Sequence, residues 1–205
     1  MMTHRRCTLL VLLLLTGTIS CKSAGSGGDV VRPRLSVAGI AAADYYPLAN
    51  GWKWAYSIWK DGMTTRAVHA VLERRGDVAV VEEGGERITY AVTPEGIAEK
   101  EGDRLGDYII KNPIRADAEW AVADGRARIV FVEGRFEDPL IGRYEGCVLI
   151  AVTRNDPKHV TQTLFAPYLG PVSMDIQAED GEEFVTIAQA QLVGVTRPGD
   201  APATP

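Results

Sequence analysis

Aromatic residues at alternate positions near residue 50 constrain the fold more than any other feature of the sequence. Three of the four tryptophans lie between residues 45 and 59. Every second residue from 52 to 58 is aromatic or aliphatic: Trp52, Trp54, Tyr56 and Ile58. In an extended chain these side chains share one face, and aromatic side chains bury large apolar areas. We therefore interpret this stretch as a strand that forms the nucleating edge of a β-sheet core.

Trp59 is out of phase with this face. If Trp52 and Trp54 line the core, Trp59 points to the other side of the sheet. There it would either line a concave surface that faces a ligand or pack under a loop. The candidate core or ligand-facing aromatic residues are therefore Trp52, Trp54, Tyr56 and Trp59.

The alternation of apolar and polar residues recurs along the rest of the chain. Turn sequences such as Asp61-Gly62 and Asp180-Gly181 separate the segments. We expect strands at residues 52–59, 64–74, 78–82, 87–93, 97–100, 126–133, 142–154, 159–165, 172–178 and 183–193. Residues 115–123 have helical propensity over one or two turns. A strand roughly every 8–12 residues predicts an all-β fold: a single curled antiparallel sheet, half-barrel or barrel-like, with little helix.

The N-terminal residues resemble the signal of a bacterial lipoprotein. Residues 4–6 (His-Arg-Arg) are basic, and residues 9–15 form an unbroken apolar run. A membrane-spanning helix needs about 20 apolar residues, so this shorter run indicates a secretory signal peptide. Ser20 and Cys21 follow it, a small residue and a cysteine, as in the site where lipoproteins are cleaved and lipidated. An ordinary cleaved signal with an incidental cysteine is the alternative.

This resemblance implies a protein anchored in the bacterial cell envelope. Two or more acyl chains on Cys21 would hold the chain stably to a membrane. Lys22 stands where an aspartate would signal retention in the inner membrane, which suggests the outer membrane, facing the periplasm. We expect a signal peptide at residues 1–20, a flexible tether at 21–43, an antiparallel β domain at 44–196 and a disordered tail at 197–205.

Charge and cysteine content limit the partners. The formal net charge of −5 argues against nucleic acid, because binding a phosphate backbone requires a basic patch. The expected partners are the membrane, through acylated Cys21, and an apolar ligand or another envelope protein. Cys147 is the only cysteine left once Cys7 leaves with the signal peptide and Cys21 is lipidated, so no intrachain disulfide forms. Its apolar surroundings predict a buried structural residue and not a reactive thiol.

No residue pattern in the chain indicates catalysis. His69 shares a predicted strand face with Ala67, which favours a packed or edge histidine over a ligand. Asp156 and His159 could supply two metal ligands, whereas zinc takes three or four, and a solvated turn is the simpler interpretation. The acidic stretch at residues 175–183 lacks the spacing of a calcium loop. With no nucleophile elbow, Cys–His neighbourhood or P-loop, we assign no catalytic residue, no metal site and no cofactor.

Three segments carry a combination of motifs. Residues 46–56 fit the pattern Tyr-Pro-Leu-x-x-Gly-x-x-Trp-x-Tyr, residues 144–148 read Tyr-Glu-Gly-Cys-Val, and residues 166–172 read Ala-Pro-Tyr-Leu-Gly-Pro-Val. In these motifs the chain resembles a group of uncharacterised bacterial lipoproteins, over most of residues 44–194. The resemblance implies a curled antiparallel sheet, similar in fold to half-barrel lipoprotein carriers. The motifs imply no particular chemistry.

Two hypotheses about function follow. The first is a lipid-anchored envelope lipoprotein without enzymatic activity, in a binding, scaffold or assembly role. Its sharper form is a carrier that holds an apolar ligand on the concave face of the sheet, which a concave face tightly filled by side chains would argue against. The second is an envelope hydrolase that uses carboxylates or His159. Turnover that His159→Ala abolishes would support the hydrolase.

Overall fold

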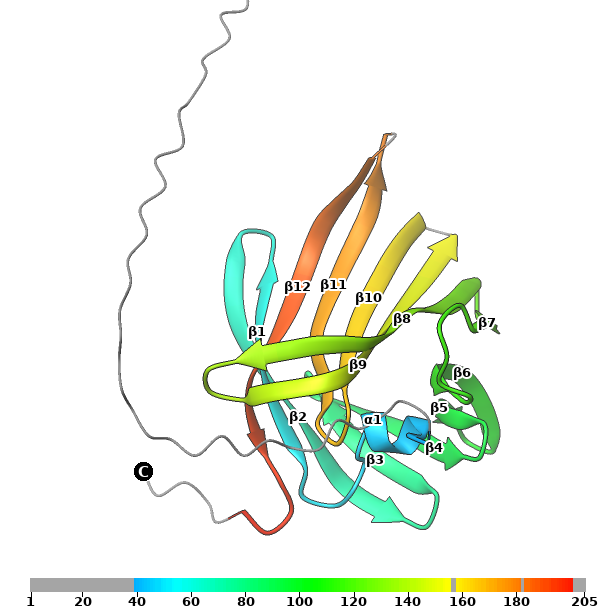
Figure 1. Ribbon diagram of the computed structural model, residues 1–205, viewed down its shortest axis with the longest axis vertical. Helices are drawn as coiled ribbons and strands as arrows, with labels where there is room; N and C mark the ends of the chain where they lie inside the picture. Colours follow the sequence, from blue (N-terminus) through cyan, green and yellow to red (C-terminus); the bar gives the residue numbers. More distant parts are fainter. Residues whose placement is uncertain (1–38, 156–157, 182, 201–205) are drawn as a thin grey trace, which may run out of the picture. The chain divides into compact units, whose positions relative to one another are not determined.

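The computed structural model describes residues 39–155, 158–181 and 183–200 of the chain (Figure 1). The expected signal peptide, Cys21 and nearly all of the expected tether lie outside these residues. The described residues form α1 (Ala42–Tyr45), β1 (Lys53–Lys60), β2 (Met63–Arg75), β3 (Val78–Glu83), β4 (Glu86–Thr93), β5 (Gly96–Glu101), β6 (Arg104–Lys111), β7 (Glu119–Val122), β8 (Gly125–Asp138), β9 (Gly142–Asn155), β10 (Lys158–Ala166), β11 (Gly170–Asp180) and β12 (Glu183–Thr196). Within this part of the chain, no helix has the length and apolar character needed to cross a membrane.

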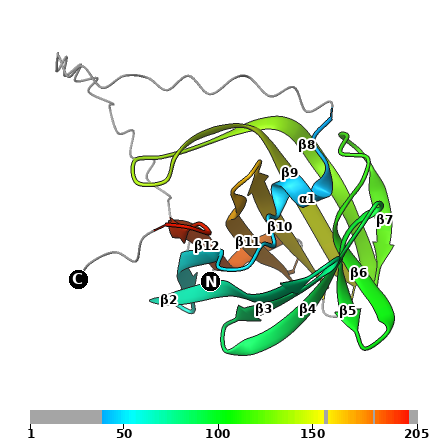
Figure 2. The same ribbon diagram turned by 90° about the horizontal axis from the view of Figure 1, so that it is seen from below.

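All twelve strands belong to one antiparallel sheet, in the order β6-β5-β4-β3-β2-β1-β12-β11-β10-β9-β8-β7. The first strand, β1, pairs with the last strand, β12, whereas β6 and β7 are consecutive in the chain but form the two edges. The sheet curls until these edges come close together (Figure 1, Figure 2). The prediction of an all-β fold built from a single curled antiparallel sheet with little helix is confirmed.

Turn residues that tolerate positive φ set the register of the first hairpin. Asp61 and Gly62 have φ values of 52° and 75° and form a two-residue loop between the paired residues Lys60 and Met63. Such turns match the twist of the flanking strands. The loop therefore holds β1 and β2 in the register that keeps the aromatic side chains of β1 on one face.

The aromatic strand β1 lies in the middle of the sheet and not at an edge. It pairs with β2 on one side and with β12 on the other. The pairing of the first strand with the last is a long-range contact, which local periodicity does not predict. The aromatic face of β1 points into the curl of the sheet, where Trp54 is fully buried.

Strand pairing overrides helical propensity in the region of residues 115–123. Part of this region, Glu119–Val122, forms β7, and Trp120 lies opposite Ala127 of β8. Trp120 is 7% exposed, and its burial outweighs propensity differences of a few tenths of a kcal/mol per residue. Strand β6 is also absent from the expected strands, because bulges in its pairing with β5 interrupt the alternation.

Residues 40–48, which we call the plug, lie inside the curled sheet (Figure 1, Figure 2). The Tyr45 hydroxyl donates to the Gly146 carbonyl of β9 at 2.7 Å. The Ala42 N–H donates to the side-chain oxygen of Asn112, after β6, at 2.9 Å. The plug buries Ile40, Ala42, Tyr45, Tyr46 and Leu48, so the packed core already includes residues before the expected domain start at Asp44.

The chain also packs beyond its last strand. Strand β12 ends at Thr196, the expected end of the domain. Arg197, expected in the disordered tail, lies with its guanidinium 5.9 Å from the centre of the Trp52 ring and donates to the Tyr144 hydroxyl at 3.0 Å. Residues 201–205 lie outside the described part.

Candidate ligand-binding site on the inner face of the sheet

One part of the inner face is filled by buried aromatic side chains, which we call the aromatic floor: Tyr46, Trp54, Tyr56, Tyr90 and Phe165. Each is 5% exposed or less. The ring of Tyr46 lies 5.3 Å from that of Trp54 and 5.8 Å from that of Tyr90. Aromatic pairs at such separations stabilise a core beyond the area they bury. The floor therefore fixes the plug, which carries Tyr46, to β1, β4 and β10.

The loop between β10 and β11 holds the floor through its backbone. The Trp54 indole N–H donates to the Leu169 carbonyl at 2.6 Å, and the Tyr56 hydroxyl donates to the Pro171 carbonyl at 2.9 Å. Gly170, between them, has a φ of 109°, and a Cβ there would lie 2.8 Å from Trp54 Nε1. Glycine allows this close approach of backbone to indole.

Beyond the floor, the inner face is lined by small or apolar side chains, most of which are only partly buried. Strand register aligns two rows of inward-facing residues across β1, β12, β11, β10 and β9. The row next to the floor contains Ile58, Ala190, Met174, Thr163 and Ile150, and the following row contains Lys60, Ala188, Ile176, Thr161 and Val152. We call the uncharged members of these rows the apolar wall. Burial decreases along it, because two residues of the first row are buried and only Ala188 of the second.

The facing strands β2 to β5 present a polar wall instead, which comprises His69, Glu83, Glu86 and Glu99. His69 lies opposite the inward-facing Trp54, and Glu99 lies opposite the inward-facing Tyr90. Glu83 accepts hydrogen bonds from the hydroxyls of Tyr46 at 3.2 Å and Tyr90 at 2.8 Å. Its second oxygen lies 3.7 Å from Nδ1 of His69. The side chains of His69 and Glu83 are 25% and 21% exposed although they point inward, so solvent reaches the inner face here.

Burial shifts the pKa of two residues of the polar wall, His69 and Glu99. Desolvation lowers the pKa of His69, and the Glu83 carboxylate offsets part of this shift, so His69 is neutral at pH 7. Desolvation also raises the pKa of Glu99, and the nearby carboxylates of Asp107 and Glu83 raise it further, whereas the Arg154 guanidinium lowers it. Desolvation and then Glu83 raise the pKa of three hydroxyls of the floor, which therefore remain hydrogen-bond donors: Tyr46, Tyr56 and Tyr90.

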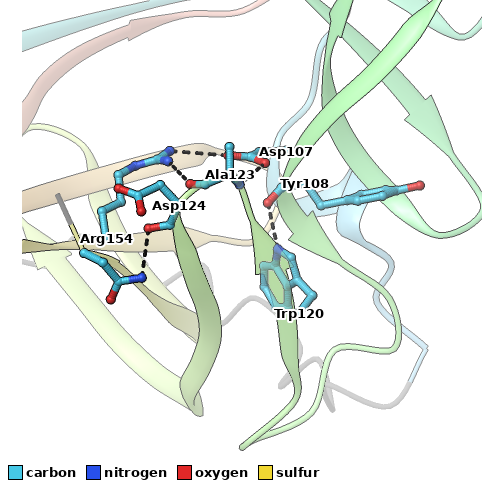
Figure 3. A network of polar contacts seen from close by, with 7 residues as sticks. Asp107, Tyr108, Trp120, Ala123, Asp124 and Arg154 are labelled. Carbon is cyan, nitrogen blue, oxygen red and sulfur yellow. Dashed lines mark hydrogen bonds and ion pairs between the residues drawn. The ribbon is translucent and has the colours of Figure 1, made fainter.

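Side chains bridge the seam between the edge strands β6 and β7 (Figure 3). The Trp120 indole N–H donates to the Tyr108 carbonyl at 2.8 Å. The Asp107 carboxylate accepts the Ala123 N–H at 2.7 Å and lies 3.4 Å from the Arg154 guanidinium, which donates to the Ala123 carbonyl at 2.6 Å. Among the described residues, no backbone ladder joins these two strands. Asp107 thus balances the charge of Arg154, and the sheet closes through side chains.

A recess beside the seam is the alternative place for a ligand. Its volume is about 130 Å³, and Lys111, Arg115 and Trp120 are among the residues that line it. Ligand pockets are typically about 300–1,000 Å³. The recess is therefore small, and the inner face remains the candidate site.

The structure places the aromatic residues that the sequence singles out on opposite sides of the sheet. Trp52, Trp54 and Tyr56 are 8%, 0% and 5% exposed. The rings of Trp52 and Trp54 stack at 5.6 Å. Trp59 points to the outer face and is 40% exposed. The concave surface is thus the one that carries Trp54, and Trp59 lies on the convex side.

The other residues considered for chemistry do not gather at one centre. His69 and His159 point inward, half-buried, from β2 and β10. No group of three or more His, Cys, Asp or Glu side chains suited to a metal ion occurs within the described residues. Asp156 and Cys21 lie outside them. Cys147 is fully buried, and burial raises its pKa to about 12.

The polar wall is the part of the site that sequence reasoning missed. Glu83 comes two residues after the buried Val81, and Glu99 comes two residues after the buried Ile97, so each continues an inward phase. This alternation is the only feature of the sequence that indicates that the two carboxylates point inward. Charged residues beside turns usually belong to solvated strand ends, and only the long-range register shows that these point into the curl.

Comparisons with known proteins show a limited structural likeness. No family model matches the chain, and no curated protein sequence matches it. One similar solved structure is a Bacteroides fragilis protein described as exported and as having a YmcC-like fold, with a TM-score of 0.47 and 11% identity over 74% of this chain and 98% of that one. Another is a Parabacteroides distasonis protein described as a lipoprotein, with a TM-score of 0.39 and 12% identity over 74% of this chain and 98% of that one. Likeness at this level carries no argument about function.

Proposed function

We propose that this chain is a lipid-anchored protein of the bacterial envelope, without enzymatic activity, that binds an apolar ligand on the inner face of its sheet. The observation that carries the proposal is the incomplete burial of the apolar wall. Ile58, Met174 and Ile176 point into the curl and yet are only half-buried. A ligand that covers this wall removes apolar area from water, which favours binding.

The width of the sheet supports the proposal. A closed barrel of about eight strands is just wide enough for its own side chains to fill. This sheet has twelve strands, and the plug and the aromatic floor occupy only part of its inside. Thr161, on the wall, is a small side chain that is only partly buried. The partial exposure of inward-facing side chains on the wall supports a concave face that can take a ligand, as a carrier requires.

Titration with N-phenyl-1-naphthylamine, a neutral apolar dye that brightens in apolar surroundings, tests this binding. We expect saturable binding to the wild-type chain. Ala190→Trp adds bulk to the apolar wall and should weaken binding about tenfold or more, since it blocks the site. Gln189→Trp adds the same bulk to the outer face and should leave the affinity unchanged. Ala188→Phe is a smaller block in case Ala190→Trp unfolds.

Two results would contradict the proposal. If the dye does not bind saturably, the inner face is not a binding site. If Gln189→Trp weakens binding as much as Ala190→Trp, the dye binds elsewhere. Circular dichroism of each variant establishes that it remains folded.

The lipid anchor is tested separately. The motif at Ser20 and Cys21 and the apolar run before it support anchoring, and Lys22 supports the outer membrane facing the periplasm. We expect Cys21→Ser to move the protein from the membrane fraction to the soluble periplasmic fraction, because acyl chains hold it to the bilayer. Density-gradient separation of the two membranes should place the wild-type chain in the outer one. Retention of Cys21→Ser in membranes would contradict the anchor.

A further inference from the structure

We infer that the ligand of the inner face is a cationic amphiphile, whose apolar tail lies on the apolar wall and whose positively charged head lies at the polar wall. This inference rests on the proposed function, because it specifies the chemistry of the ligand which that site would hold. Two independent properties of the inner face lead to it: the apolar character of one wall and the charge of the facing wall.

The apolar wall suits an alkyl tail. Its two rows cross five strands, and Lys60 at the exposed end of β1 is their only charged member. Met174 and Ile176 offer apolar surface that is half-buried and hence open to contact. A tail placed here covers apolar area without desolvating a charge, which would be costly.

At the polar wall, where the charged head of the ligand would lie, carboxylates outnumber basic groups. Glu83, Glu86 and Glu99 point inward from β3, β4 and β5. Across the seam, Arg154 lies 3.4 Å from the Asp107 carboxylate and also lowers the pKa of Glu99, so its charge is shared between these two carboxylates. Among the described residues, other basic groups that face inward include Arg74, which donates to the Leu48 carbonyl of the plug at 3.1 Å, as well as Lys60 and two histidines, of which His69 is neutral because burial lowers its pKa.

These charges select the head of the ligand. Desolvation raises the pKa of Glu99, and the Asp107 and Glu83 carboxylates raise it further, whereas Arg154 lowers it. An ammonium group near Glu99 would be attracted by these carboxylates. A sulfate or phosphate head would face like charges at the same place. An uncharged head would gain no Coulomb attraction. The polar wall therefore favours a positive head over a neutral one, and a neutral head over a negative one.

Three detergents with the same dodecyl tail test this order: dodecyltrimethylammonium, dodecyl maltoside and dodecyl sulfate. Each displaces N-phenyl-1-naphthylamine from the full Cys21→Ser chain, below its critical micelle concentration and at low salt. We expect the cationic detergent to bind about fivefold or more tightly than the maltoside, and the sulfate to bind most weakly. Added salt should reduce the differences, because it screens the partly exposed carboxylates.

A matched pair of variants locates the effect. Glu99→Gln removes one charge from the polar wall and should lower the preference for the cationic head about twofold to fivefold. Asp175→Asn makes the same change in net charge on the outer face, where Asp175 accepts a hydrogen bond from Gln189, and should leave the preference unchanged. Glu99 is exposed, so its substitution should not unfold the chain.

The possible failures are distinguishable. If the three detergents bind equally, or if dodecyl sulfate or dodecyl maltoside binds most tightly, the inference is wrong while the proposed apolar site stands. If Asp175→Asn lowers the preference as much as Glu99→Gln, net charge and not the polar wall selects the head, which also overturns the inference. If neither the dye nor any detergent binds, the proposed function itself fails.

Discussion

At the scale of single residues, the aromatic floor depends on a contact that leaves no room for a side chain. Trp54 is fully buried, and its indole lies against the backbone at Gly170. The indole N–H is satisfied by the Leu169 carbonyl, as a buried polar group must be. The sequence predicts that Trp54 is a core residue, because its alternation with Trp52 and Tyr56 is local. It does not predict which loop covers the indole, because that loop lies more than a hundred residues away along the chain.

Gly170→Ala should destabilise the fold by about 2–4 kcal/mol, because the new Cβ would combine positive φ with a clash against Trp54. Gly85→Ala is the control, since Gly85 has a φ of 90° but a Cβ at that position would meet no other atom within 4 Å. That variant should lose only about 1–2 kcal/mol, from backbone strain alone. Urea denaturation measures both free energies of unfolding. Equal losses of unfolding free energy in the two variants would show that the contact with Trp54 does not contribute to stability.

At the scale of elements, the three motifs of the sequence meet in one packed unit. Tyr45, beside the first motif, donates to Gly146 of the second, and Trp54 and Tyr56 donate to the loop of the third. The motifs are thus explained by packing around the plug. Most strands are predictable because their alternation and turn residues are local. Strand β7 is not, because its conformation follows from pairing with β8 and from the burial of Trp120.

The seam between β6 and β7 should loosen when its side-chain bridge is removed. Arg154→Ala deletes both the contact with Asp107 and the hydrogen bond to the Ala123 carbonyl. We expect backbone amides of β6 and β7 to exchange with deuterium about fivefold faster, as the loss of about 1 kcal/mol of local stability implies. Hydrogen exchange followed by mass spectrometry resolves these strands.

Arg126→Ala is the matched control for the seam. Its ion pair with Glu119, at 3.2 Å, joins two strands that already share a ladder, and both side chains are largely exposed. Such pairs contribute about 0–1 kcal/mol. Exchange in β6 should therefore stay unchanged in this variant. Unchanged exchange in Arg154→Ala as well would mean that other contacts close the sheet.

At the scale of the whole molecule, the inside of the sheet combines two environments. The plug and floor make one part a packed core, and the two walls leave the other part accessible to solvent. The sequence predicts a curled sheet but not this division. The reason is that Ile40 and Ala42 lie in a stretch without clear periodicity that resembles a tether. Their role as core residues depends on the curl that encloses them.

The buried tyrosines make the stability of the whole fold sensitive to alkali. Desolvation raises the pKa of four of them: Tyr45, Tyr46, Tyr56 and Tyr90. Above about pH 10 the unfolded chain releases these protons and the native chain keeps them, so the native state binds more protons and the free energy of unfolding falls as pH rises. The loss is about 1.4 kcal/mol per pH unit for each such tyrosine.

Urea denaturation at increasing pH measures how steeply the free energy of unfolding falls with pH. Tyr90→Phe should reduce this slope by the contribution of one tyrosine. Tyrosinate absorbance supplies the second readout. We expect part of the absorbance change to appear only when the chain unfolds. Complete ionisation of all seven tyrosines in a chain that is still folded would contradict the burial of the floor.

A pair of labels on adjacent residues of β10 tests most directly whether the inner face holds an apolar ligand. Thr161 points to the apolar wall, beside Ile176 and Val152, and Gln162 points outward. Bimane, an environment-sensitive fluorophore, can be attached to Thr161→Cys or Gln162→Cys in a chain in which Ser replaces both Cys7 and Cys21, since burial raises the pKa of the Cys147 thiol to about 12 and keeps it unreactive. On addition of dodecyl maltoside, we expect a saturable blue shift of the emission at position 161 and none at 162. Equal shifts at both positions, a shift only at 162, or no shift at either would contradict an apolar site on the inner face.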